Sequence, residues 1–441
     1  MKKLLSISFL SFGLMAGAIE QLPIIQTKYN ADPAPMVHND TIFLYTSHDE
    51  DDAEGYGFKM QDWLLYTSTD MVNWTEHGAV ASLKDFKWFN RDNGAWAIQV
   101  VERNGKFYMY CPIHGNGIGV LVADSPYGPF KDPIGKPLVW QKEHWNDIDP
   151  TVFIDDDGQA YMYWGNPELY YVKLNEDMVS YSGEIHKFDR APQHYQEGPW
   201  FYKRDGRYYL AFASTCCPEG IGYAMSDNAT GPWETKGYIM RPTERTRGNH
   251  PGIADYKGKT YLFGHSYDIL RLETADHHER RSVNAAEMEY NSDGTIKEVP
   301  YWKDIELKQI EPFNPFRRVE AETMAWGFGL KTRPHGVRNM VVTDIDNGEY
   351  LCLRGVDFGK KGAKKLSVCV ASSKNGSCIK VRIDAKDGAV IGTLPVDSTG
   401  SDDSYSLLSC KLEKVKGIHD LYFTFEGDGE DLFNFDYWEL K

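Results

Sequence analysis

One pattern recurs through the first 300 residues: a short polar turn is followed by a run of aromatic and aliphatic residues. The turns are Asn-Asp, Asn-Gly, Asp-Gly, Asp-Gly and Lys-Gly, and the five copies span residues 39–45, 104–110, 157–163, 205–210 and 257–263. Asn-Gly and Asp-Gly between apolar runs are strong signals of β-hairpins. The copies lie about 50 to 65 residues apart, which suits a four-stranded propeller blade, so we predict five blades.

A second repeat supports this interpretation. Residues 123–130 (Ala-Asp-Ser-Pro-Tyr-Gly-Pro-Phe) resemble residues 226–233 (Ser-Asp-Asn-Ala-Thr-Gly-Pro-Trp), and residues 68–74 form a looser copy. Each copy is placed between two expected strands, as a turn between the outer strands of a blade would be. Helical periodicity is scarce, so we predict an all-β chain whose five-bladed β-propeller spans residues 19–310.

The pattern changes at residues 311–318, where Glu-Pro-Phe-Asn-Pro-Phe-Arg-Arg contains two prolines and indicates a linker. Further strands are expected near 364–371, 378–384, 409–412, 420–425 and 433–440. Their number and the length of residues 319–441 predict a single β-sandwich, or jelly-roll, module after the propeller.

Residues 1–18 have the features of a secretory signal peptide. Lys2 and Lys3 precede an apolar stretch, and Ala16-Gly17-Ala18 offers a small-residue cleavage site. No cysteine follows that site, and no later apolar run reaches the roughly 18 residues of a membrane span. We therefore expect an exported protein, secreted or periplasmic, without a membrane anchor.

Net charge, aromatic content and the number of cysteines give further expectations. The formal net charge of −16 argues against nucleic acid and anionic membranes as partners, whereas a neutral glycan is compatible with it. Aromatic residues make up 14% of the chain, which suits either a sugar-binding cleft or strand packing. Seven cysteines leave at least one thiol unpaired. The adjacent Cys216 and Cys217 are not expected to form a disulfide with each other. We expect the protein to be a monomer.

Three acidic motifs each precede an apolar or aromatic run. They are Ala31-Asp32-Pro33, Ile148-Asp149-Pro150 and Gln196-Glu197-Gly198-Pro199. Any one of them alone reads more simply as a turn or a cap. In a propeller, however, the starts of the innermost strands line one mouth, so acids from different blades converge there. Three such acids suit hydrolysis of a glycosidic bond, in which one carboxylic acid protonates the leaving oxygen and one carboxylate activates water.

With these motifs, residues 28–305 resemble glycoside hydrolase family 43, a family of five-bladed inverting arabinofuranosidases, xylosidases and arabinanases. The segments Asn249-His250-Pro251-Gly252 and Arg280-Arg281-Ser282-Val283 also match. The resemblance implies that Asp32 is the general base, that Asp149 modulates the pKa of the acid, and that Glu197 is the general acid. An inverting enzyme of this kind would hold the carboxyl groups of Asp32 and Glu197 roughly 6.5–9.5 Å apart.

The same resemblance implies further site residues. Trp96 and Trp164 would lie at the sugar pocket, and Arg281 would contact the sugar and the acids. His250 matches a histidine that helps to hold calcium near the propeller axis in several members; a core histidine satisfied by hydrogen bonds is the alternative. The acidic run 49–54 reads either as a loop of the mouth or as a solvated charge run.

Residues 319–441 resemble carbohydrate-binding module family 6. Glu320, Glu322 and Asp436 match a structural calcium site of that family, and Asn434 matches a sugar-contacting position. The loop 399–405 lacks the tryptophan that the family often has there. Either Trp326 or Tyr405 substitutes for it, or the module only braces the propeller.

Together these features predict an inverting glycosidase that removes arabinofuranosyl units from plant polysaccharides such as arabinoxylan or arabinan. A β-xylosidase, or a bifunctional xylosidase and arabinofuranosidase, is the alternative, because the two sugars present similar hydroxyl groups. A non-catalytic glycan-binding protein is a third possibility, although binding alone would not need three clustered carboxylates.

Overall fold

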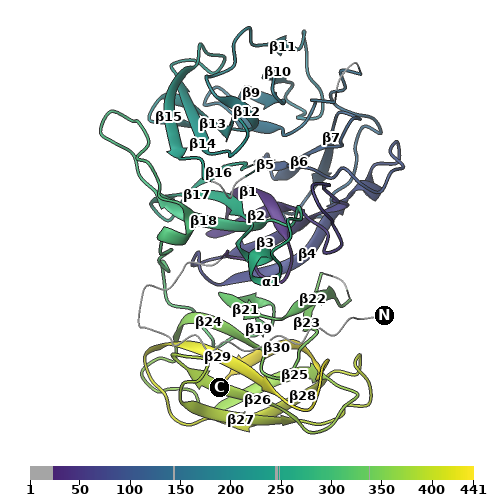
Figure 1. Ribbon diagram of the computed structural model, residues 1–441, viewed down its shortest axis with the longest axis vertical. Helices are drawn as coiled ribbons and strands as arrows, with labels where there is room; N and C mark the ends of the chain where they lie inside the picture. The colour runs from purple at the N-terminus through teal and green to yellow at the C-terminus, as the bar shows by residue number, and fades with distance from the viewer. Residues whose placement is uncertain (1–22, 143–144, 244–246, 248, 337) are drawn as a thin grey trace.

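The computed structural model describes the chain except residues 1–22, 143–144, 244–246, 248 and 337, so the predicted signal peptide lies outside the described residues. Two β-rich units lie one above the other in Figure 1. The described part also holds three short helices, η1 (Leu83–Asp85), α1 (Asp268–Glu273) and η2 (Trp302–Asp304). None of the described helices is both long enough and apolar enough to cross a membrane.

The first unit consists of five antiparallel sheets that follow one another along the chain. The first sheet contains β1 (Asn30–His38), β2 (Thr41–His48), β3 (Asp62–Ser68) and β4 (Trp74–Ser82), and the second β5 (Gln99–Arg103), β6 (Lys106–Pro112) and β7 (Ile118–Ala123). The third contains β8 (Thr151–Ile154), β9 (Ala160–Trp164), β10 (Tyr170–Leu174) and β11 (His186–Lys187). The fourth contains β12 (Tyr195–Arg204), β13 (Arg207–Ser214), β14 (Ile221–Ser226) and β15 (Glu234–Met240), and the fifth β16 (Gly252–Tyr256), β17 (Lys259–Ser266) and β18 (Ser282–Met288). This is the predicted five-bladed propeller.

Both sequence repeats fall at equivalent places in the blades. The polar turns of the first repeat join the first and second strands of all five blades. Asn104-Gly105 and Asp205-Gly206 have positive φ at both residues, as the tight hairpin turns between these strands require. The second repeat follows the third strand, after β3, β7 and β14.

The first strands of the blades surround the propeller axis. β1 packs against β5 and β16, and β8 packs against β5 and β12. Five residues just before these strands or within their first five positions line a narrow space: Pro33, Ile98, Pro150, Pro199 and Pro251. The acidic motifs therefore converge at one end of the axis, as the sequence indicated.

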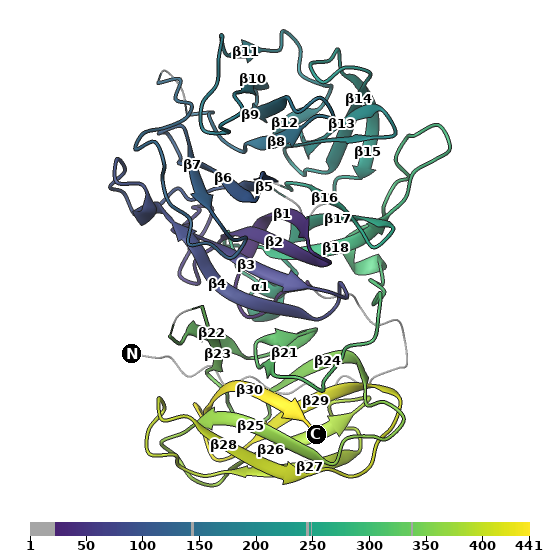
Figure 2. The same cartoon turned by 180° about the vertical axis from the view of Figure 1, so that it is seen from behind.

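The second unit is a sandwich of two antiparallel sheets with one core between them (Figure 2). One sheet has the order β22 (Lys331–Pro334), β23 (Met340–Thr343), β30 (Asn434–Leu440), β25 (Lys365–Ala371) and β28 (Ser406–Lys411), and β19 (Val319–Glu320) also pairs with β30. The other has the order β21 (Trp326–Phe328), β24 (Tyr350–Asp357), β29 (Ile418–Glu426), β26 (Ser377–Ile383) and β27 (Val390–Val396).

The two units share a sheet. The short strand β20 (Thr323–Met324) of the second unit pairs with β4 and extends the first blade to five strands. The segment 311–318, expected to be a linker, is itself packed: Phe313 is buried in the sandwich core and its backbone pairs with Gly355 and Asp357. The connection is thus a docked interface rather than a free tether.

Candidate active site

The backbone departs from regular strand geometry at or next to each of the three acids. β1 has a register shift between Ala31 and Ala34, and β12 is irregular on both sides of Glu197. Asp32 (φ 52°), Asp149 (φ 57°) and Gly198 (φ 57°) all adopt the left-handed conformation, and each precedes a proline. A non-glycine residue in this conformation is uncommon, and such strain clusters at functional sites.

The three acids line one small pocket that is open to solvent. Its lining contains two aspartates, a glutamate, an arginine and a histidine together with apolar side chains: Asp32, Phe58, Met60, Trp96, Ala97, Ile148, Asp149, Glu197, His250 and Arg281. This combination of a few convergent charged groups with apolar walls is typical of a pocket for one small polar group.

His250 lies among the three carboxylates. Its Nδ1 is 3.5 Å from Asp32 Oδ1, and its Nε2 is 3.6 Å from Asp149 Oδ2 and 3.8 Å from Glu197 Oε1. Burial lowers the pKa of His250, but the neighbouring carboxylates, Asp149 foremost, outweigh burial and raise it to about 10. The imidazole is therefore a cation at neutral pH, and it offsets part of the repulsion among the acids.

Asp149 holds a proton more readily than an ordinary aspartate does. Burial and the negative charges of Glu197 and Asp32 raise its pKa to about 7, against the opposing effect of His250. Its Oδ2 accepts a hydrogen bond of 3.2 Å from the backbone N–H of Gly198, the residue after Glu197. Asp149 thus couples directly to the segment that carries the predicted acid.

Asp32 is kept ionised by Arg281. Burial alone would raise the pKa of Asp32, but the guanidinium and then His250 hold it below its ordinary value. Arg281 Nη1 donates to Asp32 Oδ1 at 2.9 Å, while its Nε and Nη2 donate to the two oxygens of Asp49, both at 2.9 Å. An ionised, fixed carboxylate of this kind can accept a proton from water.

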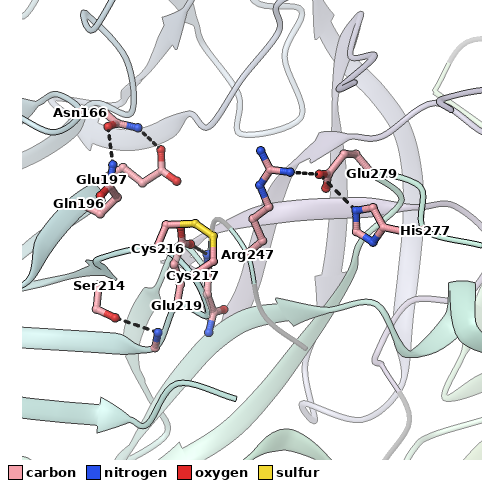
Figure 3. The surroundings of a disulfide bond; sticks show 12 residues. Asn166, Gln196, Glu197, Ser214, Cys216, Cys217, Glu219, Arg247, His277 and Glu279 are labelled. Carbon is pink, nitrogen blue, oxygen red and sulfur yellow. Dashed lines mark hydrogen bonds and ion pairs between the residues drawn. A yellow bond between two sulfur atoms is a disulfide. The ribbon is translucent and has the colours of Figure 1, made fainter. Parts of the chain in front are cut away.

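Glu197 is the most open of the three acids. Its side chain is 17% exposed, compared with 3% for both Asp32 and Asp149. Its Oε2 accepts a hydrogen bond from Asn166 Nδ2, and Asn166 Oδ1 in turn accepts one of 2.9 Å from Gln196 Nε2 (Figure 3). The open position suits a group that must reach the leaving oxygen of a bound glycoside.

The sequence profile of the Glycosyl hydrolases family 43 matches residues 21–296, the part of the chain that builds this pocket. The chain belongs to glycosyl hydrolase family 43. The profile of the family 6 carbohydrate-binding module matches residues 320–441.

Individual relatives agree with this family membership. The chain is 33% identical over 476 aligned positions to an arabinoxylan arabinofuranohydrolase of Bacillus subtilis, covering 95% of this chain and 92% of the relative. The crystal structure of a family 43 arabinoxylan arabinofuranohydrolase from that organism in complex with cellotetraose superimposes with a TM-score of 0.84 at 32% identity, covering 95% and 97% of the chains. A calcium-free β-xylosidase/α-arabinofuranosidase from a compost metagenome, in complex with xylotriose, matches 65% of this chain and 99% of its own (TM-score 0.57, 27% identity).

The two tryptophans predicted for the family 43 pocket have different places. Trp96 lines the pocket and stacks on His114, with ring centroids 4.0 Å apart. Trp164 is fully buried in the core between the second and third blades, where its Nε1 donates to Asp147 Oδ1 at 2.9 Å. The expectation that Trp164 contacts the sugar is wrong, because its indole faces hydrophobic neighbours instead of the mouth.

Two residues that hold charged groups of the pocket, Asp49 and Asn166, have no distinct signal in the sequence. Asp49 begins the acidic run 49–54, yet it is fully buried, and its carboxylate accepts hydrogen bonds from the backbone N–H and the Nε of Arg281. Its neighbour Asp52 is exposed and pairs with Lys59, as a solvated charge run would. Asn166 follows the Tyr-Trp-Gly segment without any motif of its own, so only the fold reveals its bond to Glu197.

The predicted calcium ligands of the module are close in the fold but do not form one compact cluster. Among the described residues, the groups of His, Cys, Asp and Glu ligand atoms within 4.8 Å of one another do not include Glu320, Glu322 and Asp436 together. Glu320 forms a two-pronged ion pair with Arg318, and Asp436 accepts from Asn339 Nδ2 at 2.8 Å. The buried Oε2 of Glu322 has no hydrogen-bond partner, which fits a cation ligand.

A second possible metal position lies in the pocket itself, where ligand atoms of Asp149, Glu197 and His250 lie within 4.8 Å of one another. Calcium prefers oxygen ligands, which the two carboxylates could supply. Direct ligation by His250 would require the imidazole to release its proton, because a protonated imidazole offers no lone pair.

Asn434 and the two candidate substitutes for the missing tryptophan lie apart. Asn434 Nδ2 donates to the backbone oxygen of Asp402 at 2.7 Å, in the loop that lacks the tryptophan. Tyr405 follows in that loop and packs on His335, with ring centroids 4.4 Å apart. Trp326 instead packs against a cluster of propeller residues that includes Tyr267. Tyr405 is therefore the substitute that lies near Asn434.

The cysteines depart from expectation. Cys216 and Cys217 form a disulfide bond with each other, although adjacent residues were not expected to bridge (Figure 3). The other five are free: Cys111, Cys352, Cys369, Cys378 and Cys410. These free thiols agree with the odd number of cysteines, which leaves at least one thiol unpaired.

Proposed function

We propose that this family 43 glycosidase is an inverting α-L-arabinofuranosidase that removes arabinofuranosyl units from plant polysaccharides, arabinoxylan foremost and arabinan as a further substrate. The proposal is based on the three acids of one small pocket, which differ in protonation and in exposure. Asp32 is held ionised by Arg281, Asp149 holds its proton near neutrality, and Glu197 is open to the mouth. The arabinoxylan arabinofuranohydrolases that match nearly the whole chain support the choice of sugar and polymer.

The residues divide the reaction between them. Asp32 accepts a proton from the attacking water, whose oxygen bonds to the anomeric carbon on the face opposite the leaving group. Glu197 donates its proton to the glycosidic oxygen as that bond breaks, so the polymer leaves with a hydroxyl group. Asp149 and His250 set the electrostatic environment of both acids, and Trp96 forms an apolar wall of the pocket.

A bifunctional xylosidase and arabinofuranosidase is the second candidate. Arabinofuranose and xylopyranose present similar hydroxyl groups to a small pocket, and the compost-metagenome relative is a β-xylosidase/α-arabinofuranosidase. The two candidates differ in the free sugar that they release.

The test is product analysis with arabinoxylan and with xylo-oligosaccharides, using the full chain and a Glu197→Gln control. The proposal expects free arabinose from arabinoxylan, no release from Glu197→Gln, and a first-formed sugar of inverted anomeric configuration by NMR. Release of xylose from unsubstituted xylo-oligosaccharides at a comparable rate would establish the bifunctional alternative. A retained configuration would contradict the base role of Asp32.

Three further assignments belong to this proposal. We place a structural calcium ion at Glu322, with Asp436 and Glu320 as further oxygen ligands, because the buried Glu322 carboxylate lacks a partner and burial, chiefly, raises its pKa well above the ordinary value. A calcium ion would also require Glu320 to exchange its bond to Arg318 for the metal. Chelator should lower the melting temperature of the full chain, and calcium should restore it.

The other two assignments concern the sandwich module and the location of the protein. The surface beside Asn434 and Tyr405 is proposed to bind the polysaccharide. Affinity electrophoresis on arabinoxylan would detect this binding, and Asn434→Ala would weaken it. The chain is proposed to be exported as a monomer. Cell fractionation tests the export, and light scattering of the purified chain tests the monomer.

A further inference from the structure

The only disulfide among the seven cysteines, all of which are described, joins two adjacent exposed residues. Cys216 and Cys217 lie in the loop 214–220 between β13 and β14. The five free cysteines include three that are buried. The disulfide has no part in the family 43 mechanism described above. The disulfide presents two polarisable sulfur atoms to solvent.

The disulfide loop, residues 214–220, is held firmly at its base. The backbone N–H of Ser214 donates to Gly220 O at 2.9 Å, and the N–H of Gly220 donates back to Ser214 Oγ at 2.8 Å. The N–H of Thr215 donates to His194 O at 2.8 Å, which ties the loop to the start of β12. The loop therefore holds the disulfide in a fixed position.

A further bond ties the same loop to the pocket. Glu219, the residue before Gly220, is buried, and its carboxylate accepts a 3.0 Å hydrogen bond from the backbone N–H of Asn249. Asn249 directly precedes His250, which contacts all three acids. The disulfide thus belongs to a loop that is anchored on two sides to segments carrying catalytic groups.

The loop extends beyond the predicted acid. Glu197 lies opposite Ala213 in the pairing of β12 with β13, and Cys216 follows Ala213 by three residues, in the loop after β13. Figure 3 shows the disulfide in the same surroundings as Glu197 and its partner Asn166. Neither cysteine lines the pocket that holds the acids, so the disulfide lies outside the place of the departing sugar and on the side of Glu197.

The position of Glu197 indicates which part of the substrate lies next to the disulfide. Glu197 protonates the oxygen between the departing sugar and the polymer, so the sugar ring on the far side of that oxygen lies in front of Glu197, outside the pocket. A disulfide of two adjacent residues closes a small ring, and its two sulfur atoms are polarisable and carry no hydrogen-bond donor. Such a surface suits the C–H face of a sugar ring, much as an aromatic side chain would.

We infer that the Cys216–Cys217 disulfide forms one wall of the subsite for the leaving-group sugar, a pyranose unit of the polymer that carries the arabinofuranosyl group. This inference rests on the proposed function and adds a binding subsite to it. The subsite acts on the leaving group alone, so its loss should affect only substrates that have a sugar in this position.

The test compares two substrates with the double variant Cys216→Ser/Cys217→Ser. One substrate is an arabinosylated xylo-oligosaccharide, and the other is α-L-arabinofuranosyl fluoride, whose leaving group is a single atom. We expect kcat/KM for the oligosaccharide to fall about tenfold, the size of effect that one lost apolar contact has in a binding pocket, while kcat/KM for the fluoride stays unchanged. Cys378→Ser, which alters a half-buried free thiol of the sandwich, is the matched control and should change neither value.

Unchanged kcat/KM on the oligosaccharide, or equal losses on both substrates, would overturn the inference. If the wild type hydrolyses neither substrate, the proposed function fails as well, so the two failures are distinguishable.

A second measurement removes the disulfide without mutation. Dithiothreitol reduces the bond to two thiols and is itself oxidised to a cyclic disulfide. The denatured chain should then show seven thiols in place of five. We expect the same selective loss on the oligosaccharide in the reduced wild type and no effect of the reagent on the double variant. A loss of the same size in the double variant would show that the reagent acts elsewhere and would overturn the assignment.

Discussion

Gly198 lies directly against the imidazole of His250: a Cβ atom at position 198 would be 2.7 Å from His250 Cγ. The residue also has a φ of +57°, a conformation that favours glycine. In the first and third blades the corresponding place before proline holds an aspartate, Asp32 or Asp149. In the fourth blade His250 fills that space, so the acid is supplied one residue earlier, by Glu197.

Replacing Gly198 tests this relationship. Gly198→Ala should displace His250 or Glu197 and reduce kcat/KM by about 100-fold or more, because acid–base catalysis depends on precise placement of the groups. Gly206→Ala is the matched control, because Gly206 also has a positive φ (+77°) but has no atom within 4 Å of an added Cβ. The control should lower the melting temperature slightly and leave kcat/KM unchanged. Equal losses of activity in the two variants would contradict the role of Gly198.

The charge state of His250 predicts how stability depends on pH. Its pKa in the folded chain, about 10, lies above the ordinary value of 6.5. Its stabilising contribution is therefore complete below pH 6.5 and is lost as the pH rises towards 10. The free energy of unfolding of the wild type should fall by about 1.4 kcal/mol per pH unit at the steepest point of this range.

Chemical denaturation at a series of pH values, with chelator present, measures this slope. His250→Gln should remove the slope between pH 7 and 9, whatever its effect on absolute stability. The control His38→Gln, at a surface histidine paired with Glu102, should keep it. A wild type whose stability is flat across this range would show that His250 is neutral in the folded protein.

Two aspartates of the same acidic run give a third prediction. Asp49→Asn breaks a buried pair and leaves Arg281 with Asp32 as its remaining carboxylate, so stability should fall by about 3 kcal/mol. Activity should fall as well, since Arg281 positions the base. Asp52→Asn, at the exposed end of the run, should leave both activity and melting temperature unchanged. Urea denaturation and kcat/KM on a nitrophenyl arabinofuranoside check both variants.

The shared sheet predicts that the propeller depends on the sandwich. A chain that ends at residue 310 lacks β20, which leaves the edge of β4 unpaired. The truncation also removes the Thr332 hydroxyl, which donates to the buried carboxylate of Glu76 at 2.8 Å. We expect the melting temperature of this truncated chain to lie about 5–10 °C below that of the full chain, with increased aggregation. An unchanged melting temperature would mean that the interface contributes nothing to the stability of the propeller.

The parts of the fold that follow from local chemistry were predictable from the sequence. The hairpin turns before each second strand, such as Asn104-Gly105, are set by the backbone conformations that asparagine, aspartate and glycine tolerate, and they revealed the blades. The convergence of Asp32, Asp149 and Glu197 then followed from the symmetry of a propeller. Contacts between residues distant in sequence left no such trace.

The residues whose surroundings were not predicted correctly depend on contacts or backbone geometry that the sequence pattern does not specify. Asp49 and Asp52 read alike in the sequence, and only long-range packing buries one of them against Arg281. Trp164 follows a strand pattern that does not reveal which face of the blade it occupies, and the structure places it in the core. The pairing of Cys216 with Cys217 depends on the backbone of one loop, which spacing does not specify.

In the proposed mechanism Glu197 is the acid and Asp32 is the base. The most direct test is the dependence of kcat/KM on the leaving group in Glu197→Gln and Asp32→Asn, using an arabinosylated xylo-oligosaccharide and a dinitrophenyl arabinofuranoside. Because only a poor leaving group needs protonation, Glu197→Gln should lose about 1,000-fold on the oligosaccharide but less than about tenfold on the dinitrophenyl glycoside. Asp32→Asn should lose about 1,000-fold on both, since each requires activated water. Equal losses on the two substrates in Glu197→Gln would contradict the assignment of the acid.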